Sequence, residues 1–371
     1  MDKTNEKSEL RKLRFESLKR NFNLFKQSKI GMLGLVIVLI FGLLALLQPL
    51  LFLTNIWDEA TYHPVVGYDS QKILATVVSC KNIDYPTPEY KTPSDCPAAD
   101  EVNIVAVAPY NPGIKEGDVI EQFIQPAPPS SKHILGTDSL GRDVFSQLME
   151  GSQVAFVLGL LSAIVGVGIS TLLGTIAAFF GGKIDAYLMR QSDLVLMLPT
   201  LPLLFIISAF AELKVWHLAL VLGIFGGLGG SVITIKSQAL QVKVKPFVDS
   251  ARITGGSRMT ILTSHILPNV APLALLFMVF SVTGAIASES ILSFLGLLNI
   301  DMSWGLMISV AQADGYINQG MEYWWLVIPA VLAVTLLAGG FYLVGRGLDD
   351  VFNPRLRRRS VSYTHLTLPT S

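Results

Sequence analysis

Six long apolar runs dominate this 371-residue sequence, and each is long enough to cross a lipid bilayer as a helix. They cover residues 30–53, 154–180, 186–210, 216–235, 270–297 and 324–344. A bilayer offers no partners to backbone polar groups, so such runs cross it as helices. Only 15% of the residues are charged, against about a quarter in soluble domains. The sequence therefore predicts an all-α, multi-pass membrane protein.

Positive charge is distributed unevenly along the chain. If the two termini and residues 179–193 and 236–268 are assigned to one side of the membrane, that side holds 21 of the 28 Lys and Arg. Cytoplasmic loops of membrane proteins carry such an excess. We therefore expect both termini, and the polar connector at 236–268, to be cytoplasmic.

An insert, residues 54–151, separates the first two apolar runs and is expected on the exterior. It contains ten of the nineteen prolines, which predicts turns and short strands, such as one at 102–107. Cys80 and Cys96 lie in this insert. They can form a disulfide in an oxidising compartment, and free thiols are the alternative.

The remaining segments divide the chain further. Residues 1–29 are basic, with apolar side chains on one helical face, so they either lie on anionic membrane lipid or are simply solvated. Residues 152–355 contain the helical core. The tail, residues 356–371, is expected to be disordered and is left out of the fold argument.

The polar connector contains a stretch, residues 249–269, that is longer than a link between two helices needs to be. We interpret it as a docking segment for another protein. Residues 248–254 can form a short helix that Gly255 and Gly256 terminate. Pro268 can begin the next spanning helix, where its missing N–H costs little.

Several side chains of the docking segment suit contact with a partner. Ser250 and Ala251 are small enough for a protein surface to approach closely, and Arg252 provides charge. His265 is expected to pack or to form hydrogen bonds. No GxxxxGK[ST] loop occurs, so we do not expect this chain to hydrolyse a nucleotide by itself. The five His and two Cys lack ligand spacing, so we expect neither a catalytic nor a metal site.

A polar turn with the sequence HILGTDSLGRD, residues 133–143, precedes the second apolar run. Its glycines permit a tight turn, and its charged residues can pair and cap a helix that begins near residue 144. These residues are Gly136, Asp138, Gly141, Arg142 and Asp143. A catalytic carboxylate pair is the alternative. We expect a structural clamp or a contact for a delivering protein at the outer mouth.

Four residues of the apolar runs are candidates for lining or bracing a transport pathway. Arg190 and Asp193 are three residues apart and can pair on one helix face. Pro199 should kink or break the third span. Glu289 is the one acid within the predicted span 270–297, which makes it a functional candidate. Its place near the outer end favours a hydrogen-bonded brace over a proton relay.

Two of these motifs resemble signatures of the permeases of binding-protein-dependent ABC importers. Their coupling loop has the pattern Glu-Ala-Ala, three residues, Gly, nine residues, Ile-x-Leu-Pro. The matching positions here are Asp249, Ser250, Ala251, Gly255, His265, Leu267 and Pro268, with Asp, Ser and His as departures. The signature Gly-Thr-Asp-x-x-Gly-Arg-Asp of the peptide/nickel subfamily is matched by Gly136, Thr137, Asp138, Gly141, Arg142 and Asp143. The resemblance extends over about residues 132–355.

The resemblance implies a type I importer permease with six transmembrane helices, similar to the second, C-type permease of oligopeptide or dipeptide systems. It implies a bacterial or archaeal plasma membrane, a second homologous permease, two ATP-binding subunits that hold ATP and Mg, and an extracytoplasmic substrate-binding protein. This chain would hold no cofactor and contact no nucleic acid. Nickel chelates, glutathione and peptide-like antibiotics are alternative substrates.

Three other classes of protein compete with this interpretation. An ion-coupled secondary carrier needs ionisable residues near mid-membrane, and only Glu289 comes close. A membrane enzyme needs a cluster of acids, bases or metal ligands, which only the turn at 138–143 approaches. A receptor or scaffold would use the exterior insert but would leave the docking segment without a purpose.

Overall fold

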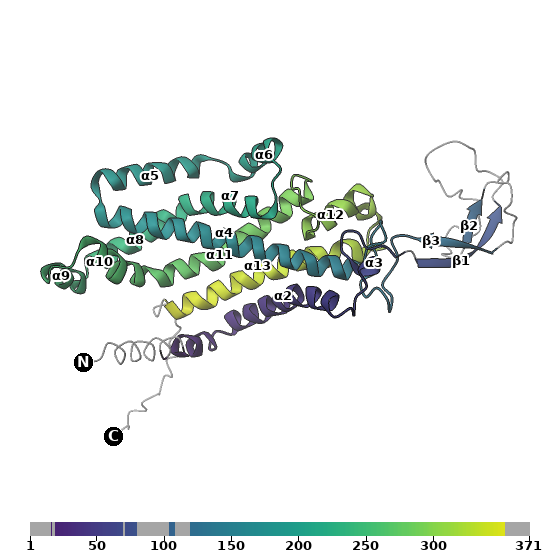
Figure 1. The fold of residues 1–371 in the computed structure, drawn as a ribbon, viewed down its shortest axis with the longest axis horizontal. Helices are drawn as coiled ribbons and strands as arrows, with labels where there is room; N and C mark the ends of the chain where they lie inside the picture. Colours follow the sequence, from purple (N-terminus) through teal and green to yellow (C-terminus); the bar gives the residue numbers. More distant parts are fainter. Residues whose placement is uncertain (1–15, 17–18, 70, 80–103, 108–118, 353–371) are drawn as a thin grey trace, which may run out of the picture. The chain divides into compact units, whose positions relative to one another are not determined.

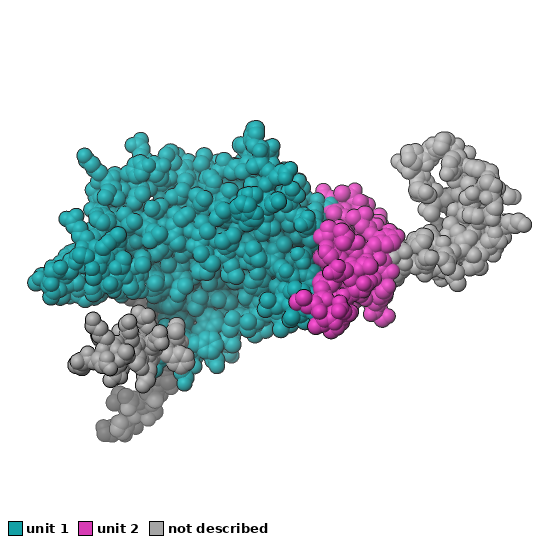
Figure 2. Space-filling model, in the orientation of Figure 1, with its two compact units in different colours: residues 1–50, 148–309, 329–371 teal, residues 51–147, 310–328 magenta. Residues whose placement is uncertain are grey.

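The computed structural model describes residues 16, 19–69, 71–79, 104–107 and 119–352, with the strands described by their backbone alone. The chain divides into two compact units (Figure 2). Unit 1 consists of Met1–Leu50, Leu148–Ser309 and Pro329–Ser371, and unit 2 of Leu51–Gln147 and Val310–Ile328. Cys80, Cys96, most of the segment 1–29 and the tail 356–371 lie outside the described residues.

Long apolar helices make up most of the chain (Figure 1). Single helices long enough to span a membrane are α2 (Lys29–Leu53), α4 (Val144–Phe180), the continuous stretch Arg258–Phe294 that ends in α11 (Leu267–Phe294), and α13 (Trp324–Phe352). Two bent pairs add α5 (Gly182–Met197) with α6 (Thr200–Phe210), and α7 (Val215–Leu228) with α8 (Gly230–Lys243). With each pair counted as one span, the described residues contain the six spans that the sequence predicts.

Two of the spans are broken. Between α5 and α6 the chain bends by 83°, and Pro199 is the N-cap of α6. Pro199 has no N–H to continue the helix, so the predicted break is confirmed. The 45° bend between α7 and α8 at Gly229 was not predicted. Helix α8 continues to Lys243, so the predicted end of this span at residue 235 is wrong.

The helix that enters the membrane after the docking segment begins earlier than predicted. Its first turn is α10 (Arg258–Ile261), and a π-helical turn, η1 (Leu262–Ile266), leads into α11. Ser257 caps the start, because its Oγ accepts the Thr260 N–H at 3.1 Å. Pro268 stands in the first turn of α11, as predicted, but the helical stretch that contains it begins ten residues earlier, at Arg258.

Glycines allow the helices of unit 1 to pack closely. A Cβ atom on Gly166 of α4 would lie 2.9 Å from the Gly223 carbonyl oxygen, and one on Gly227 would lie 2.6 Å from the Gly166 carbonyl oxygen. Gly223 and Gly227, four residues apart on α7, are thus a helix contact. Gly226 and Gly230 have the same spacing but make no such contact, because Gly226 has open space around its Cβ position and Gly230 meets only one side-chain atom, at 4.0 Å.

A further helix, α12, covers Trp304–Ala313. Within unit 1 the Trp304 indole is buried and donates its Nε1–H to the Leu148 carbonyl oxygen at 2.9 Å. Gly151 leaves room for this ring, since a Cβ atom there would collide with it. A tryptophan in this place fixes the start of α12 to α4.

Unit 2 contains the short helix α3 (Glu59–Tyr62), the 3₁₀ turn η2 (Tyr316–Gln319) and a three-stranded sheet. The strands are β1 (Gln71–Ser79), β2 (Ile104–Val107) and β3 (Val119–Ile124), in the order β2-β1-β3. β1 pairs in parallel with β2 and antiparallel with β3. The strand predicted at 102–107 is described from Ile104 onward. The insert is therefore partly β-structured.

Candidate functional site

The docking segment forms a short helix, α9 (Pro246–Ile253), at the end of unit 1 where α8 and α10 meet (Figure 1). Pro246 stands in the first turn, where its missing N–H costs nothing, and Asp249 and Arg252 suit the two ends of the helix dipole. Arg252 Nη1 lies 2.9 Å from Asp249 Oδ1. Gly255 has φ of 84°, a left-handed conformation that ends the helix.

Helix α9 is anchored by one side. Val248 is fully buried in an apolar cluster that α9 shares with α8, α10, η1 and α11. Ala251 packs against the same cluster. Other members are Ile235, Ala239, Val242, Ile261, Leu262, Ile266 and Val270. Helix α9 is therefore packed against α8 and α11 through buried side chains.

The opposite side of α9 and the turn after it are exposed. Asp249, Ser250, Arg252, Gly255 and Gly256 all belong to this surface. Large apolar side chains are exposed here too: Ile253 at 87%, Met259 at 65% and Phe247 at 39%. Exposed apolar groups on a polar, protruding segment are typical of a protein contact surface.

The later part of the docking segment has a supporting role. His265 lies in the π-helical turn, half-buried, with its ring 6.4 Å from the Phe247 ring. Its carbonyl oxygen accepts a hydrogen bond from Asn269 Nδ2 at 2.7 Å. Leu267 is half-buried and Pro268 is exposed. His265 thus packs against α9, as the sequence predicts.

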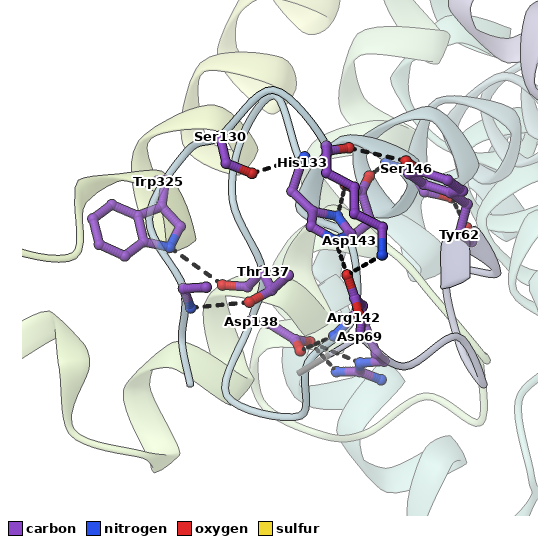
Figure 3. A network of polar contacts seen from close by, with 12 residues as sticks. Tyr62, Asp69, Ser130, His133, Thr137, Asp138, Arg142, Asp143, Ser146 and Trp325 are labelled. Carbon is purple, nitrogen blue, oxygen red and sulfur yellow. Dashed lines mark hydrogen bonds and ion pairs between the residues drawn. The ribbon is translucent and has the colours of Figure 1, made fainter. Parts of the chain in front are cut away.

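In unit 2, the turn at 136–143 is closed by its own side chains (Figure 3). Asp138 accepts hydrogen bonds from the N–H groups of Leu140 and Arg142 and pairs with the Arg142 guanidinium at 2.7 Å. Gly136 and Gly141 both have positive φ, as a tight turn requires. Asp138 and Arg142 therefore hold the turn as the sequence predicts.

Two further hydrogen bonds fix the buried Thr137. Its Oγ1 accepts the Ala127 N–H at 2.9 Å, and its carbonyl oxygen accepts the Trp325 Nε1–H at 3.2 Å (Figure 3). Ala127 lies 10 residues before Thr137, and Trp325 lies 188 residues after it. The turn is thereby tied to the loop before it and to the start of α13.

Asp143 does not join Asp138 and Arg142, which corrects the predicted three-residue cluster. Its Oδ1 caps α4 by accepting the Ser146 N–H at 2.6 Å, and its Oδ2 lies 2.7 Å from His133 Nδ1. The other ring nitrogen of His133, Nε2, lies 2.9 Å from Asp69 Oδ2 (Figure 3). His133 is fully buried, so one imidazole ring bridges two carboxylates.

The charges of this bridge support one another. Burial lowers the pKa of His133, but hydrogen bonds to Asp143 and Asp69 outweigh it and raise the pKa above its ordinary value of 6.5. For Asp69 the signs are reversed. Burial raises its pKa, but the hydrogen bonds and positive charges of Lys132 and His133 outweigh burial and lower the pKa below its ordinary value of 3.8. Lys132 Nζ lies 2.6 Å from Asp69 Oδ2. We call Asp69, Lys132, His133 and Asp143 the histidine bridge.

The bridge and the turn have the properties of a structural clamp. The Asp138 and Asp143 carboxylates are each held by several hydrogen-bond donors, and the Ser146 hydroxyl beside Asp143 donates to the Tyr62 carbonyl oxygen. Among the described residues, no group of three His, Cys, Asp or Glu has an arrangement that could hold a metal ion. His133 belongs to the HILGTDSLGRD motif, so the sequence could single it out. Asp69 lies 64 residues away, and no motif around it indicates that it contacts His133.

The pathway candidates lie in different surroundings. Glu289 on α11 is buried, and it accepts hydrogen bonds from Ser293 Oγ at 2.6 Å and Ser290 Oγ at 3.3 Å. Arg190 and Asp193 on α5 are exposed, and the described structure shows no ion pair between them. The predicted pair is therefore wrong, since exposed long side chains gain little by pairing. Asp185 of α5 instead pairs with Lys236 of α8 at 2.5 Å.

Comparison with known proteins points in one direction. Residues 170–358 match the family model described as "Binding-protein-dependent transport system inner membrane component". A dipeptide transport system permease protein of Bacillus subtilis is 30% identical over 69% of this chain and 79% of its own length. An oligopeptide transport system permease protein of Mycobacterium tuberculosis is 33% identical over 63% of this chain and 80% of its own length.

A third relative shows the same extent of likeness. An oligopeptide transport system permease protein of Haemophilus influenzae is 32% identical over 61% of this chain and 71% of its own length. The family comprises membrane subunits of transport systems and not enzymes. The family model matches half of the chain, and a relative is 30% identical over 69% of it. This chain therefore belongs to the family of inner-membrane components of binding-protein-dependent transport systems.

Proposed function

We propose that this chain is the C-type permease subunit of an ATP-driven ABC importer and forms half of the pathway for oligopeptides or dipeptides. The substrate class follows from the relatives, which are named as dipeptide and oligopeptide permeases. Nickel chelates, glutathione or peptide-like antibiotics would use the same architecture. The path would be completed by a second, homologous permease.

The observation that carries the coupling role is the shape of the docking segment. Helix α9 exposes one side and buries Val248 from the other in a cluster with α8 and α11. ATP and Mg would bind two partner ATPase subunits, and closure of these subunits would push α9. The motion would pass to α8 and α11 and switch the pathway between inward-facing and outward-facing states.

The remaining proposed partners follow from the topology. With both termini in the cytoplasm of a bacterial or archaeal cell, α9 faces the ATPases and unit 2 faces the exterior. An extracytoplasmic substrate-binding protein would then contact the turn that contains Gly136, Thr137, Asp138, Gly141 and Arg142. Glu289 would brace the outer end of α11 through its serine hydrogen bonds.

A bulky charge on the exposed side of α9 tests the coupling role. Ser250→Arg should abolish co-purification of the ATPase subunits and lower peptide uptake at least tenfold, because Ser250 is exposed and its replacement leaves the Val248 anchor intact. The matched control is Asn318→Arg, which adds the same charge at an exposed site of unit 2. Full ATPase retention and uptake in Ser250→Arg would refute the role of α9.

The substrate class needs its own measurement. Proteoliposomes with the complete importer should take up labelled di- or oligopeptides in an ATP-dependent way, and excess unlabelled peptide should compete. A nickel chelate or glutathione that is taken up while peptides are not would overturn the peptide assignment but leave the coupling role of α9 untouched.

A further inference from the structure

A cavity of about 370 Å³ lies between the end of α4 and the docking segment. It is lined by Phe179, Phe180, Arg252, Gly256, Arg258 and Ile261. Its volume falls within the range of small-ligand pockets, roughly 300–1,000 Å³. Helix α4 is one of the membrane-spanning helices and ends at Phe180. The cavity therefore lies where the apolar part of the protein gives way to the polar docking segment.

Positive charge at this cavity exceeds negative charge. Arg252 gives one N–H to Asp249, and a guanidinium has five N–H donors, so others stay available. Arg258 is exposed, and its side chain has no ion pair or hydrogen bond to the described residues. Lys243 is not one of the lining residues, but it lies next to Phe179, because its Nζ donates to the carbonyl oxygens of Ala178 and Phe179 at 2.9 and 2.8 Å. These acceptors are neutral, so they leave the lysine charge uncompensated.

Two guanidinium groups that share a cavity favour a phosphate as ligand. Arginine binds phosphate oxygens through paired N–H donors and does so more strongly than neutral hydrogen bonds allow. The same cavity has an apolar wall made of Phe179, Phe180 and Ile261. A free phosphate ion gains nothing from such a wall, whereas the glycerol and first acyl carbons of a phospholipid do.

We propose that this cavity binds the phosphate of an anionic phospholipid headgroup, with Arg252 and Arg258 on the phosphate and the two phenylalanine rings against the lipid backbone. The site goes beyond the permease function, because transport by itself requires no lipid ligand. The lipid connects the end of α4 to α9, so the lipid composition of the membrane tunes how firmly the docking segment is held. Basic pockets at the ends of spanning helices are known to suit such headgroups.

Lipid retention measured by native mass spectrometry tests the site. The full-length chain is purified from nanodiscs of equal phosphatidylglycerol and phosphatidylcholine. Wild-type protein should retain phosphatidylglycerol in preference, and Arg258→Gln should lower that preference about fivefold, the effect of one basic residue near a lipid surface. Arg258→Lys, which keeps the charge, should retain most of it. Arg258 is exposed, so neither change removes a packed side chain.

Arg346→Gln is the matched control. Arg346 lies near the end of α13 in unit 1, is exposed, and pairs only with Asp349, at 3.5 Å, among the described ion pairs. Its loss should leave the phosphatidylglycerol preference unchanged. An equal effect of Arg258→Gln and Arg346→Gln would mean general charge attraction and would overturn the site.

Two other results would also overturn the proposal. Displacement of the retained lipid by millimolar inorganic phosphate would assign the cavity to a free phosphate ion. If Arg258→Gln weakens retention of the ATPase subunits while the lipid preference stays as in wild type, the arginine pairs with an acidic side chain of the partner. Since Ser250→Arg tests α9 separately, failure of the lipid site and failure of the coupling role are distinguishable.

Discussion

At the scale of single residues, the histidine bridge joins segments that are far apart in the sequence. His133 contacts Asp143, which lies 10 residues later in the chain, and Asp69, which lies 64 residues earlier. Both carboxylates favour the charged imidazolium, and the imidazolium favours both carboxylates. The bridge therefore depends on the protonation states of His133 and Asp69.

Stability should fall on both sides of a pH optimum set by this bridge. The raised pKa of His133 contributes stability that is complete below 6.5 and is lost as the pH rises through the raised value. The lowered pKa of Asp69 contributes stability that is present above 3.8 and is lost as the pH falls through the lowered value. Thermal unfolding between about pH 2 and pH 9 measures both.

His133→Gln should flatten the alkaline side of this profile. A neutral amide cannot replace the imidazolium, and the buried Asp143 carboxylate loses a donor, at a cost of roughly 1–3 kcal/mol. His217→Gln, at the start of α7, is the control and should keep the wild-type profile. An unchanged alkaline limb in His133→Gln would show that the bridge does not control stability.

Glu289 should behave as a brace. Glu289→Gln keeps acceptor capacity for Ser293 and Ser290, so we expect peptide uptake within about twofold of wild type, with the same dependence on external pH. Glu289→Ala should cost roughly 1–3 kcal/mol, because the buried hydroxyls lose their partner. Loss of uptake in Glu289→Gln with an intact unfolding temperature would point to an obligatory proton step.

At the scale of elements, glycines set how closely the helices approach. Gly227 of α7 contacts Gly166 of α4, whereas Gly226, one residue before it, faces open space. The spacing of small residues along the sequence does not distinguish these two glycines. The difference depends on which side of α7 faces α4.

A pair of alanine substitutions separates the two positions. Gly227→Ala should lower the free energy of unfolding by roughly 1–3 kcal/mol, because its Cβ would lie 2.6 Å from the Gly166 carbonyl oxygen. Gly226→Ala should be neutral or stabilise by up to about 1 kcal/mol through helix propensity. Thermal unfolding of the purified chain compares them, and equal destabilisation would mean that the two helices do not pack through Gly227.

At the scale of the whole molecule, the docking helix α9 is where the proposed ATPase contact would reach the spanning helices. The surface of α9 and its anchor can be altered separately, since Val248 is buried and Ile253 is 87% exposed; Val244, at the end of α8, is 74% exposed as well. Under the proposed coupling role, binding of an ATPase and transmission of its motion would be distinct properties of one short helix.

Val248→Ala should uncouple ATP hydrolysis from uptake. The loss of two buried methyl groups costs about 2 kcal/mol and loosens α9 from α8 and α11, while the exposed surface remains. We expect the ATPase subunits to stay bound and the peptide transported per ATP to fall severalfold in proteoliposomes. Val244→Ala is the control. An unchanged transport ratio in Val248→Ala would exclude the anchor as the transmitting contact.

The sequence by itself determined the features that depend on neighbours along the chain. Run length and hydropathy defined six spans, Pro199 predicted the break between α5 and α6, and Gly255 predicted the end of α9. Each of these follows from backbone chemistry within a few residues. The motif spacing around Asp249 also located the docking segment and indicated its family.

Only the tertiary structure decided which distant groups meet. Asp69 with His133, Trp304 with Leu148, and the arginines of the docking segment with the end of α4 are contacts between segments that carry no local signal for one another. A π-helical turn before Pro268 and the bend at Gly229 likewise depend on how whole helices pack. Sequence patterns show which side chains can be buried or charged, and packing selects their partners.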